Sequence, residues 1–356
     1  MKKIKILSSV MVTLLLFTGC SNTSNSTDST KKSTKKNAFQ TITDSSGKKV
    51  KVPTKISKVA DSWKAHNEIL PVLGAGDKII STSLTKKNQP WLYKVNPTMN
   101  KATSTFGTTF NAEELLKNKP DIVFSADSDT FKDKISSIGL PVVTVSFKDF
   151  DSMKKCISLT GKILGGNAVL RANKYNTYLD KKLKIVKGIT SQIPDNSKPK
   201  VLHLQSLTPL KVDGSNTIIN DWIEAAGGIN SAKEINGNMK EISTEQILKW
   251  NPDVIIVGAN GTPADLNILL KDSRLRNVPA IKNNRVYQNP AGAFDWDRYG
   301  CEEALQVQWA AKMLYPSKFK SLDMVSETKY FYKTFLNYNL TTDQANRILK
   351  AETPEN

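Results

Sequence analysis

The sequence predicts an α/β protein in which two lobes, each built on a mainly parallel sheet, are joined by one long rigid α-helix. Three observations carry this prediction. Short apolar runs typical of strands alternate with amphipathic segments typical of helices, one segment has the periodicity of a single long helix, and two similar blocks lie on either side of that segment. A chain of 356 residues also suits two lobes of about 130–150 residues each.

The predicted long helix covers residues 166–190. Gly165 and Gly166 separate it from an earlier helical run, and Pro194 stops the chain beyond it. At about 1.5 Å per residue it spans roughly 35 Å, the width of a small domain. Its apolar face repeats at three- and four-residue steps and consists of Val169, Ala172, Tyr175, Leu179, Leu183 and Val186.

The two similar blocks are residues 111–124 (NAEELLKNKPDIVF) and residues 243–256 (STEQILKWNPDVII). Each has an N-cap residue, a glutamate in the first helical turn, a short amphipathic helix, the dipeptide Pro-Asp and an apolar strand. Their register on both sides of residues 166–190 indicates two similar, Rossmann-like α/β lobes. We therefore expect an N-terminal lobe at residues 38–165 and a C-terminal lobe at residues 191–356.

The N-terminal lobe is expected to open with a β-hairpin, because residues 39–52 alternate apolar and polar around Ser46-Gly47. Strands and helices then alternate, which favours a largely parallel sheet. An irregular polar stretch is expected at residues 83–105. The expected strands are residues 56–60, 78–81, 122–125 and 140–145, and the expected helices include one that leads to residue 73, one in the first block and one opened by residues 127–129.

The C-terminal lobe is expected to follow a similar plan from a strand at residues 201–204. A loop at residues 289–300 (NPAGAFDWDRYG) is dense in aromatic side chains. The other expected elements are helix 218–226, strands 254–258 and 285–287, and three closing helices at residues 302–313, 325–335 and 343–349.

The N-terminal sequence has the pattern of an export signal. Lysines at residues 2, 3 and 5 precede an apolar run, residues 6–17, which is too short for a stable membrane span. Cys20 follows Thr18-Gly19 at the end of this run, and the pattern resembles a bacterial lipobox. That resemblance implies a lipoprotein signal peptide at residues 1–19 and a diacylated Cys20 as the mature N-terminus. Ordinary secretion with a chance cysteine is the alternative.

Residues 20–37 are expected to form a flexible tether. After Cys20 they are rich in Ser, Thr, Asn and Lys and contain no apolar residue, so they cannot bury a core. A lipid at Cys20 followed by such a tether predicts a protein anchored to the outer face of the cell membrane, as in a Gram-positive bacterium.

The formal net charge of +18 does not indicate nucleic-acid binding. The excess is nearly all dispersed lysine, no arginine precedes Arg171, and no recognition helix or zinc finger is evident. Solubility and attraction to an anionic cell surface account for the charge. Cys156 and Cys301 are expected in different lobes, so buried free thiols are favoured over a disulfide.

The sequence shows no catalytic set, and we expect neither enzymatic activity nor a cofactor. It has two histidines, no glycine-rich phosphate loop, no G-x-S-x-G elbow, and too few close ligands for a bare transition metal. His203 lies inside an apolar strand and is expected to be a core residue. His66 lies where a strand leads into a helix, where it could face a ligand.

Ligands of open parallel sheets bind beyond the carboxyl ends of the strands, so two such lobes should hold a ligand between them. Aromatic side chains concentrated in loops suggest a large, partly apolar ligand, although plain packing is the alternative for each. Arg298 could pair with an acidic group of that ligand. The predicted ligand-binding residues are Trp63, His66, Trp91, Tyr93 and Asp127 from one lobe, and Asn260, Phe294, Trp296 and Arg298 from the other.

Glu113 and Glu245 occupy equivalent positions in the two similar blocks. An acid in the first turn is favoured by the helix dipole, which is a sufficient local explanation. Their equivalence also suggests one surface carboxylate per lobe, offered to a two-fold partner, because charged rims guide docking and set register.

The lipobox, the paired blocks ending in Pro-Asp and the single long helix resemble the helical-backbone substrate-binding proteins of bacterial ABC importers. These proteins take up ferric siderophores, haem and vitamin B12. The resemblance covers about residues 39–350 and implies a monomer whose lobes bind ligand between them with little hinge motion. It also implies that Glu113 and Glu245 dock onto arginine pockets of the two permease subunits, which work with an ATPase.

The resemblance leaves the ligand open. An iron chelate of the ferric siderophore type is the first expectation, although the N-terminal lobe lacks the arginines that often hold catecholates. A corrinoid or haem, or a small metal chelate such as nickel-histidine, is the alternative. Two other classes remain: a chelatase-like enzyme, which shares paired α/β lobes, and a surface adhesion module.

Overall fold

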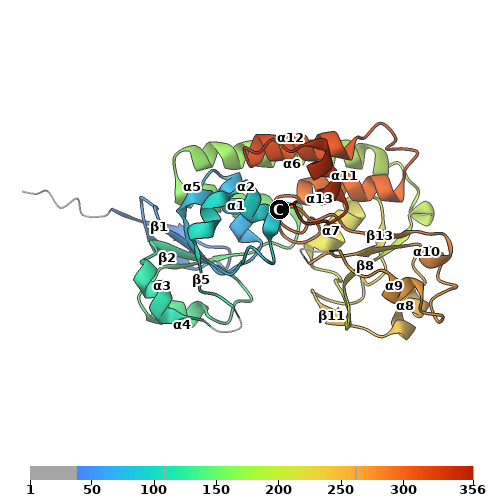
Figure 1. The fold of residues 1–356 in the computed structure, drawn as a ribbon, viewed down its shortest axis with the longest axis horizontal. Coiled ribbons are helices and arrows are strands. Elements are labelled where there is room, and N and C mark those ends of the chain that lie inside the picture. Colours follow the sequence, from blue (N-terminus) through green and yellow to red (C-terminus); the bar gives the residue numbers. More distant parts are fainter. Residues whose placement is uncertain (1–37, 108–109, 261–262, 356) are drawn as a thin grey trace, which may run out of the picture. The chain divides into compact units, whose positions relative to one another are not determined.

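The computed structural model describes residues 38–107, 110–260 and 263–355, which belong to one compact unit (Figure 1). The expected signal peptide at residues 1–19, the lipidation site Cys20 and the tether at residues 20–37 lie outside these residues. Within the described part of the chain, no helix is both long and apolar enough to cross a membrane.

A two-stranded hairpin precedes the first sheet, as the alternation of residues 39–52 predicts. Strands β1 (Phe39–Thr43) and β2 (Lys49–Pro53) pair antiparallel, and Gly47 takes a positive φ of 85° in the turn. Asp44 fixes this turn, because its Oδ1 accepts hydrogen bonds from the backbone N–H groups of Ser46 and Lys48. Its Oδ2 accepts one from Thr144 N–H, which ties the hairpin to the first sheet.

The first sheet is entirely parallel, with the strand order β5-β4-β3-β6-β7. Its strands are β3 (Val59–Asp61), β4 (Ile79–Thr82), β5 (Thr103–Ser104), β6 (Ile122–Ala126) and β7 (Val142–Val145). The helices of this region are α1 (His66–Val72), α2 (Pro90–Val95), α3 (Ala112–Asn118), α4 (Lys132–Ser137) and α5 (Phe150–Leu164), with short 3₁₀ turns at Gly76–Lys78 and Pro97–Lys101.

Residues 83–105 are more ordered than we expected. They contain α2, a 3₁₀ turn and β5. Prolines at the first positions of α2 and of the 3₁₀ turn preset φ for a helical start, and the buried side chains of Trp91, Leu92 and Met99 hold the segment on the core. The helix expected to open at residues 127–129 instead begins at Lys132.

The long helix α6 (Asn167–Thr190) agrees closely with the expected residues 166–190. Five of the six predicted apolar positions are buried, whereas Val169 in the first turn is 39% exposed. The helix packs against α5 on one side and α11 on the other. A Cβ on Gly161 of α5 would lie 2.8 Å from the Cβ of Ala172, so small residues allow α5 and α6 to approach closely.

The second sheet is mixed, with the order β11-β9-β8-β12-β13 and with β10 also paired to β8. β12 and β13 run parallel to β8, but the unexpected β9 turns back antiparallel to it. Its strands are β8 (Lys200–Leu207), β9 (Leu210–Val212), β10 (Ile229–Asn230), β11 (Lys240–Glu241), β12 (Val254–Val257) and β13 (Val286–Gln288). The helices are α7 (Ile218–Ala225), α8 (Thr244–Trp250), α9 (Asn267–Leu270), α10 (Pro279–Lys282), α11 (Glu303–Leu314), α12 (Met324–Phe335) and α13 (Thr342–Leu349), with a 3₁₀ turn at Asp195–Ser197.

The two similar blocks form the same order of elements, although the side chain of Asn111 caps α3 and that of Ser243 does not cap α8. Helices α3 and α8 each end at a left-handed residue, Lys119 or Asn251, and Pro-Asp then leads into a central parallel strand. Asp121 Oδ2 accepts a hydrogen bond from Lys58 N–H at 2.9 Å, and Asp253 Oδ2 accepts one from Lys200 N–H at 2.8 Å. Each aspartate therefore joins its strand to the first strand of the sheet, and the α/β fold with two sheets and one long helix is confirmed.

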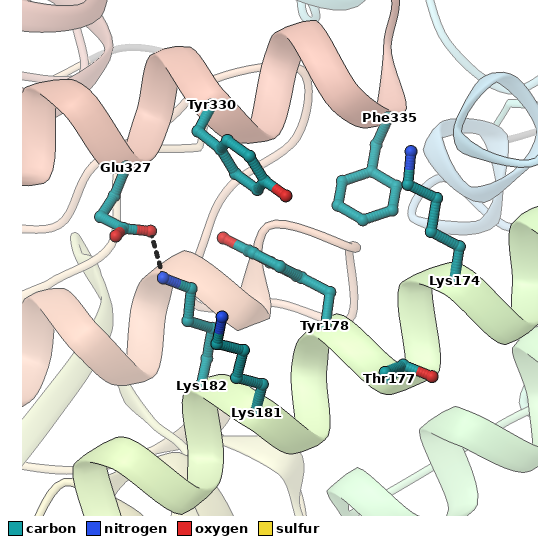
Figure 2. A pocket seen from close by; sticks show the side chains of 8 residues that line it. All are labelled: Lys174, Thr177, Tyr178, Lys181, Lys182, Glu327, Tyr330 and Phe335. Atoms are coloured by element: carbon teal, nitrogen blue, oxygen red, sulfur yellow. Dashed lines mark hydrogen bonds and ion pairs between the residues drawn. The ribbon is translucent and has the colours of Figure 1, made fainter.

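One apolar core includes residues of both sheets and of α6. Helix α12 lies on α6, and Figure 2 shows the surface pocket between them. There Lys182 pairs with Glu327 and lies 5.4 Å above the centre of the Tyr178 ring, which stacks on Tyr330. The pair and the rings hold the C-terminal helices against the long helix.

Substitution of Gly161 by Ala is expected to destabilise the protein. The added methyl meets Ala172 Cβ at 2.8 Å and the backbone oxygen of Ala168 at 3.0 Å. Overpacking should lower the free energy of unfolding by about 1–3 kcal/mol. This loss should outweigh the gain of about 1 kcal/mol from the better helix propensity of alanine. Chemical unfolding of the protein without residues 1–36 measures the change.

Gly188→Ala is the matched control, because Gly188 is also helical and has open space around its missing Cβ. We expect this variant to gain about 0.5–1 kcal/mol. Equal stabilisation by both substitutions would contradict the close packing of α5 on α6.

Candidate functional site

The two lobes meet at three aromatic side chains, which we call the inter-lobe aromatic cluster: Trp63, Phe147 and Tyr299. Trp63 follows the carboxyl end of β3, Phe147 follows that of β7, and Tyr299 precedes α11. The ring centres of Trp63 and Tyr299 lie 6.0 Å apart, and those of Phe147 and Tyr299 lie 5.5 Å apart. Trp63 and Tyr299 are half-buried, so each keeps part of its surface available.

The second lobe surrounds this cluster with polar groups. The hydroxyl of Tyr299 and the side-chain amide of Asn238 lie within hydrogen-bond distance, at 2.7–2.9 Å. Burial raises the pKa of Tyr299 to about 12, so this hydroxyl is neutral at physiological pH. The neighbouring Arg298 directs Nη1 to Asp213 Oδ2 and to the sulfur of Met239, each at 3.4 Å.

A buried charged set lies behind Arg298. His203 is fully buried, with Nδ1 3.0 Å from Asp213 Oδ2 and Nε2 2.7 Å from Asp297 Oδ2. Burial alone would lower the pKa of His203, but the hydrogen bonds and charges of the two carboxylates outweigh it and raise the pKa to about 9. His203 is therefore a core imidazolium that donates from both nitrogens, and it holds the aspartate that orients Arg298.

His66, which we expected could face a ligand, is also fully buried, and both of its ring nitrogens have partners inside the protein. Its Nδ1 lies 2.6 Å from Asp61 Oδ2 and its Nε2 lies 2.9 Å from the hydroxyl of Thr160. The ring stacks on Trp63 with an interplanar angle of 10°, and Asp61 Oδ1 accepts the backbone N–H of Trp63. His66 and Asp61 thus position the indole of Trp63.

Four of the predicted aromatic residues are packing residues in this structure. Trp91, Tyr93, Phe294 and Trp296 are each at most 7% exposed. The indole of Trp91 donates to Glu352 O, the hydroxyl of Tyr93 donates to Leu84 O, and the indole of Trp296 donates to Glu302 Oε1. These four rings therefore offer little surface to a ligand in this conformation.

Asp127 and Asn260 have exposed side chains beyond the carboxyl ends of β6 and β12, as the strand rule predicts. Asp127 forms an ion pair with Lys132 at 3.1 Å. Asn260 takes a left-handed φ of 48° and exchanges hydrogen bonds with Gln205 through both atoms of its amide. Both carry polar groups at the carboxyl edge of their sheets.

The sequence analysis missed Phe147, Tyr299, Asn238 and Met239. Phe147 follows a strand that was expected, so the rule that selected Trp63 and Asp127 also selects it. Tyr299 lies inside the predicted aromatic loop, next to Arg298. Asn238 and Met239 lie between β10 and β11 and carried no motif that could have revealed them.

Two buried carboxyl groups, one from each lobe, interact with each other. Glu68 of α1 accepts the backbone N–H of Cys301 at 2.6 Å, across the lobes. Glu302 accepts from Phe294 N–H, the Trp296 indole and the Tyr332 hydroxyl. Burial raises the pKa of Glu302 to about 7, and burial together with Glu302 raises the pKa of Glu68 well above its usual value.

Glu113 and Glu245 are both exposed in the first turns of α3 and α8. Glu245 lies 3.9 Å from the guanidinium of Arg274, which also pairs with Asp272. The hydrogen bond with Ser243 lowers the pKa of Glu245, so it is a carboxylate at neutral pH. The structure therefore presents one accessible acid at the equivalent place in each lobe.

Within residues 38–107, 110–260 and 263–355, no three or more His, Cys, Asp and Glu side chains are grouped to hold a metal ion. Cys156 and Cys301 are free and buried, as expected.

Two lobes that meet at the carboxyl ends of parallel strands, joined by one long helix, define a solute-binding protein of the kind used in import. The chain belongs to the periplasmic binding protein family, whose model matches residues 64–293. The resemblance to binding proteins of ABC importers is thus confirmed, and this chain is the solute-binding component of such a transporter.

Three relatives cover nearly the whole chain. The molybdate-binding protein MolA of Haemophilus influenzae is 27% identical over 87% of this chain and 94% of its own. The ABC transporter substrate-binding lipoprotein YvrC of Bacillus subtilis, itself uncharacterized, is 25% identical over 90% and 99%. The haem uptake protein IsdE of Staphylococcus aureus is 27% identical over 81% and 89%. These relatives are uptake or binding proteins, not enzymes.

The solved structure of MolA bound to molybdate shares the fold. It superposes with a TM-score of 0.76 at 23% identity and covers 85% of this chain and 99% of its own.

The buried carboxyl pair predicts that stability falls as pH rises. The pKa of Glu302 is raised from 4.5 to about 7, so the stability that its proton supplies is complete below about pH 4.5 and is lost as pH rises through 7. Thermal unfolding from pH 5 to pH 8 should therefore show a falling midpoint. In Glu68→Gln the fall should be smaller, because the amide oxygen still accepts from Cys301 and the second acid is gone.

The control is Glu241→Gln at an exposed glutamate, which should keep the pH dependence of the unmodified protein. A Glu68→Gln variant that loses as much stability as the unmodified protein between pH 5 and pH 8 would show that the carboxyl pair is not the cause.

Proposed function

We propose that the protein captures an iron chelate of the ferric siderophore type between its lobes and delivers it to the permease of an ABC importer. The inter-lobe aromatic cluster is the observation that carries this proposal. Trp63 and Tyr299 come from different lobes, lie 6.0 Å apart and are both half-buried. An organic chelator with flat or apolar parts can stack on such surfaces while Arg298 attracts its negative charge.

The state of the histidines favours a ligand that brings its own metal-binding groups. Both ring nitrogens of His66 and of His203 have hydrogen-bond partners, and both rings are fully buried. Neither offers a ligand to the iron of a bound haem in this conformation. A siderophore or citrate chelate needs no such ligand, because the chelator itself fills the coordination sphere.

Haem or a corrinoid remains the second candidate. A macrocycle would use the same aromatic surfaces, and the relative IsdE belongs to a haem uptake system. The smaller candidate ligands are nickel-histidine and the molybdate that MolA binds. They belong in the same binding test.

We further propose that Cys20 carries a lipid and holds the protein at the outer face of the cell membrane, as the lipobox pattern suggests. The name of YvrC as a lipoprotein supports this assignment. Exposed Glu113 and Glu245 are proposed to dock onto basic pockets of a two-subunit permease driven by an ATPase, because equivalent carboxylates on two similar lobes suit a two-fold partner.

Ligand binding should be weakened by Trp63→Ala. Titration of the protein without residues 1–36 against ferric hydroxamate, ferric catecholate, ferric citrate, haem, cobalamin, nickel-histidine and molybdate is followed by tryptophan fluorescence. We expect saturable quenching by one iron chelate and at least about a tenfold loss of affinity in Trp63→Ala, since the indole supplies roughly 1.5 kcal/mol of stacking.

Trp296→Phe is the matched control, because Trp296 is fully buried and should leave the affinity unchanged. Saturation by haem or cobalamin would select the second candidate. If Trp63→Ala binds the ligand as tightly as the unmodified protein, the aromatic cluster is not the ligand-binding site.

Glu113→Ala combined with Glu245→Ala should abolish uptake without changing ligand affinity. Both carboxylates are exposed and lie in helices α3 and α8, apart from the aromatic cluster. Uptake of the radiolabelled ligand by cells that carry only the variant tests this expectation. Glu114→Ala with Gln246→Ala changes the next residue of each helix and serves as the control. A parallel fall in ligand affinity would contradict the docking role.

A further inference from the structure

The docking helices share a second surface feature. Three residues after each proposed docking glutamate stands an exposed leucine, Leu116 in α3 and Leu248 in α8, with 43% and 40% of their surfaces accessible. Residues three apart are neighbours on one face of a helix, at about 5–6 Å between Cβ atoms. Each lobe therefore shows a carboxylate and an apolar side chain next to each other.

These leucines are not the residues that anchor their helices. The preceding residues, Leu115 and Ile247, are fully buried and anchor their helices to the sheets. Both helices have the same length, both end at a left-handed residue, and both lead through Pro-Asp to a clamped central strand. The two leucines thus project from equivalent, firmly held positions.

The placement of the helices matches a two-point contact. Within the compact unit, α3 and α8 both lie at the edge opposite α6 in Figure 1. In a protein with a net charge of +18, a carboxylate beside an exposed leucine at two equivalent points is a specific pattern. It fits a partner that has two-fold symmetry and offers, in each half, an apolar socket beside a cationic group.

We propose that Leu116 and Leu248 are the apolar contacts of the permease docking surface, one inserted into each half of the permease. This inference rests on the proposed docking role of Glu113 and Glu245 and extends it. The charges guide approach and register, whereas burial of the leucines supplies affinity that salt does not screen. Part of the docking affinity should therefore remain at high salt concentration.

The test uses the full-length protein and the permease–ATPase complex of the source organism in liposomes, with the stimulation of ATP hydrolysis as the readout. Leu116→Ala with Leu248→Ala should raise the concentration for half-maximal stimulation roughly tenfold, with ligand affinity and unfolding midpoint unchanged. Each single variant should raise this concentration about threefold. Leu170→Ala with Ile185→Ala, at exposed apolar positions of α6, is the matched control and should change nothing.

The outcomes separate this inference from the docking role itself. If the glutamate double variant loses stimulation while the leucine double variant matches the α6 control, the leucines do not contact the permease. If one leucine carries the whole effect, the two-fold arrangement is wrong. If neither the glutamate nor the leucine variants change stimulation, α3 and α8 are not the docking surface.

Discussion

The structure depends on the burial of one face of α6 in a core that both sheets share. Ala172, Tyr175, Leu179, Leu183 and Val186 are all at most 7% exposed, and the same apolar cluster includes strands of the first sheet and helices of the second lobe. Gly161 lets α5 come close to this helix. Because a shared core cannot be divided without exposing apolar surface, the two lobes hold their relative position, and with it the spacing of Trp63 and Tyr299.

Buried charges then set the details of the site. Asp61 and His66 support Trp63 from one lobe, while His203 and its two aspartates support Arg298 from the other. Such sets are stable only when each member has a partner, because an unpaired charge in the core is costly. The residues that touch solvent at the site are thus few, and those that orient them are hidden.

Periodicity and repetition were sufficient to predict most of the fold. The helix at residues 166–190, the hairpin and both Pro-Asp strands follow from local patterns that burial also requires. Residues 83–105 were predicted to be irregular because most of them are polar. The segment is ordered because Trp91 and Met99 are buried, and their burial depends on the rest of the chain. Strand β9 was missed because it is three residues long and half-buried.

The site was less predictable for a physical reason. An aromatic loop has the same composition whether its rings face a ligand or a core. Trp296 became a core residue because Glu302, six residues later, accepts its indole N–H in the interior, whereas Tyr299 reached the lobe contact through a left-handed backbone conformation. Whether such a ring is buried in the core or lies at the lobe contact depends on residues distant in sequence, so local patterns do not predict it. Residues placed directly after strands, Trp63, Asp127 and Asn260, were found correctly at the expected edge because the strand itself fixes their position.

The hydrogen bond from Cys301 to Glu68 and the common core hold the two lobes together, so a large opening would expose apolar surface. A partner that docks on α3 and α8 therefore meets nearly the same two points on an empty protein as on a loaded one. Empty and loaded forms would then compete for the same permease, and uptake would depend on the loaded fraction as well as on the ligand concentration. An excess of empty binding protein would slow its own importer.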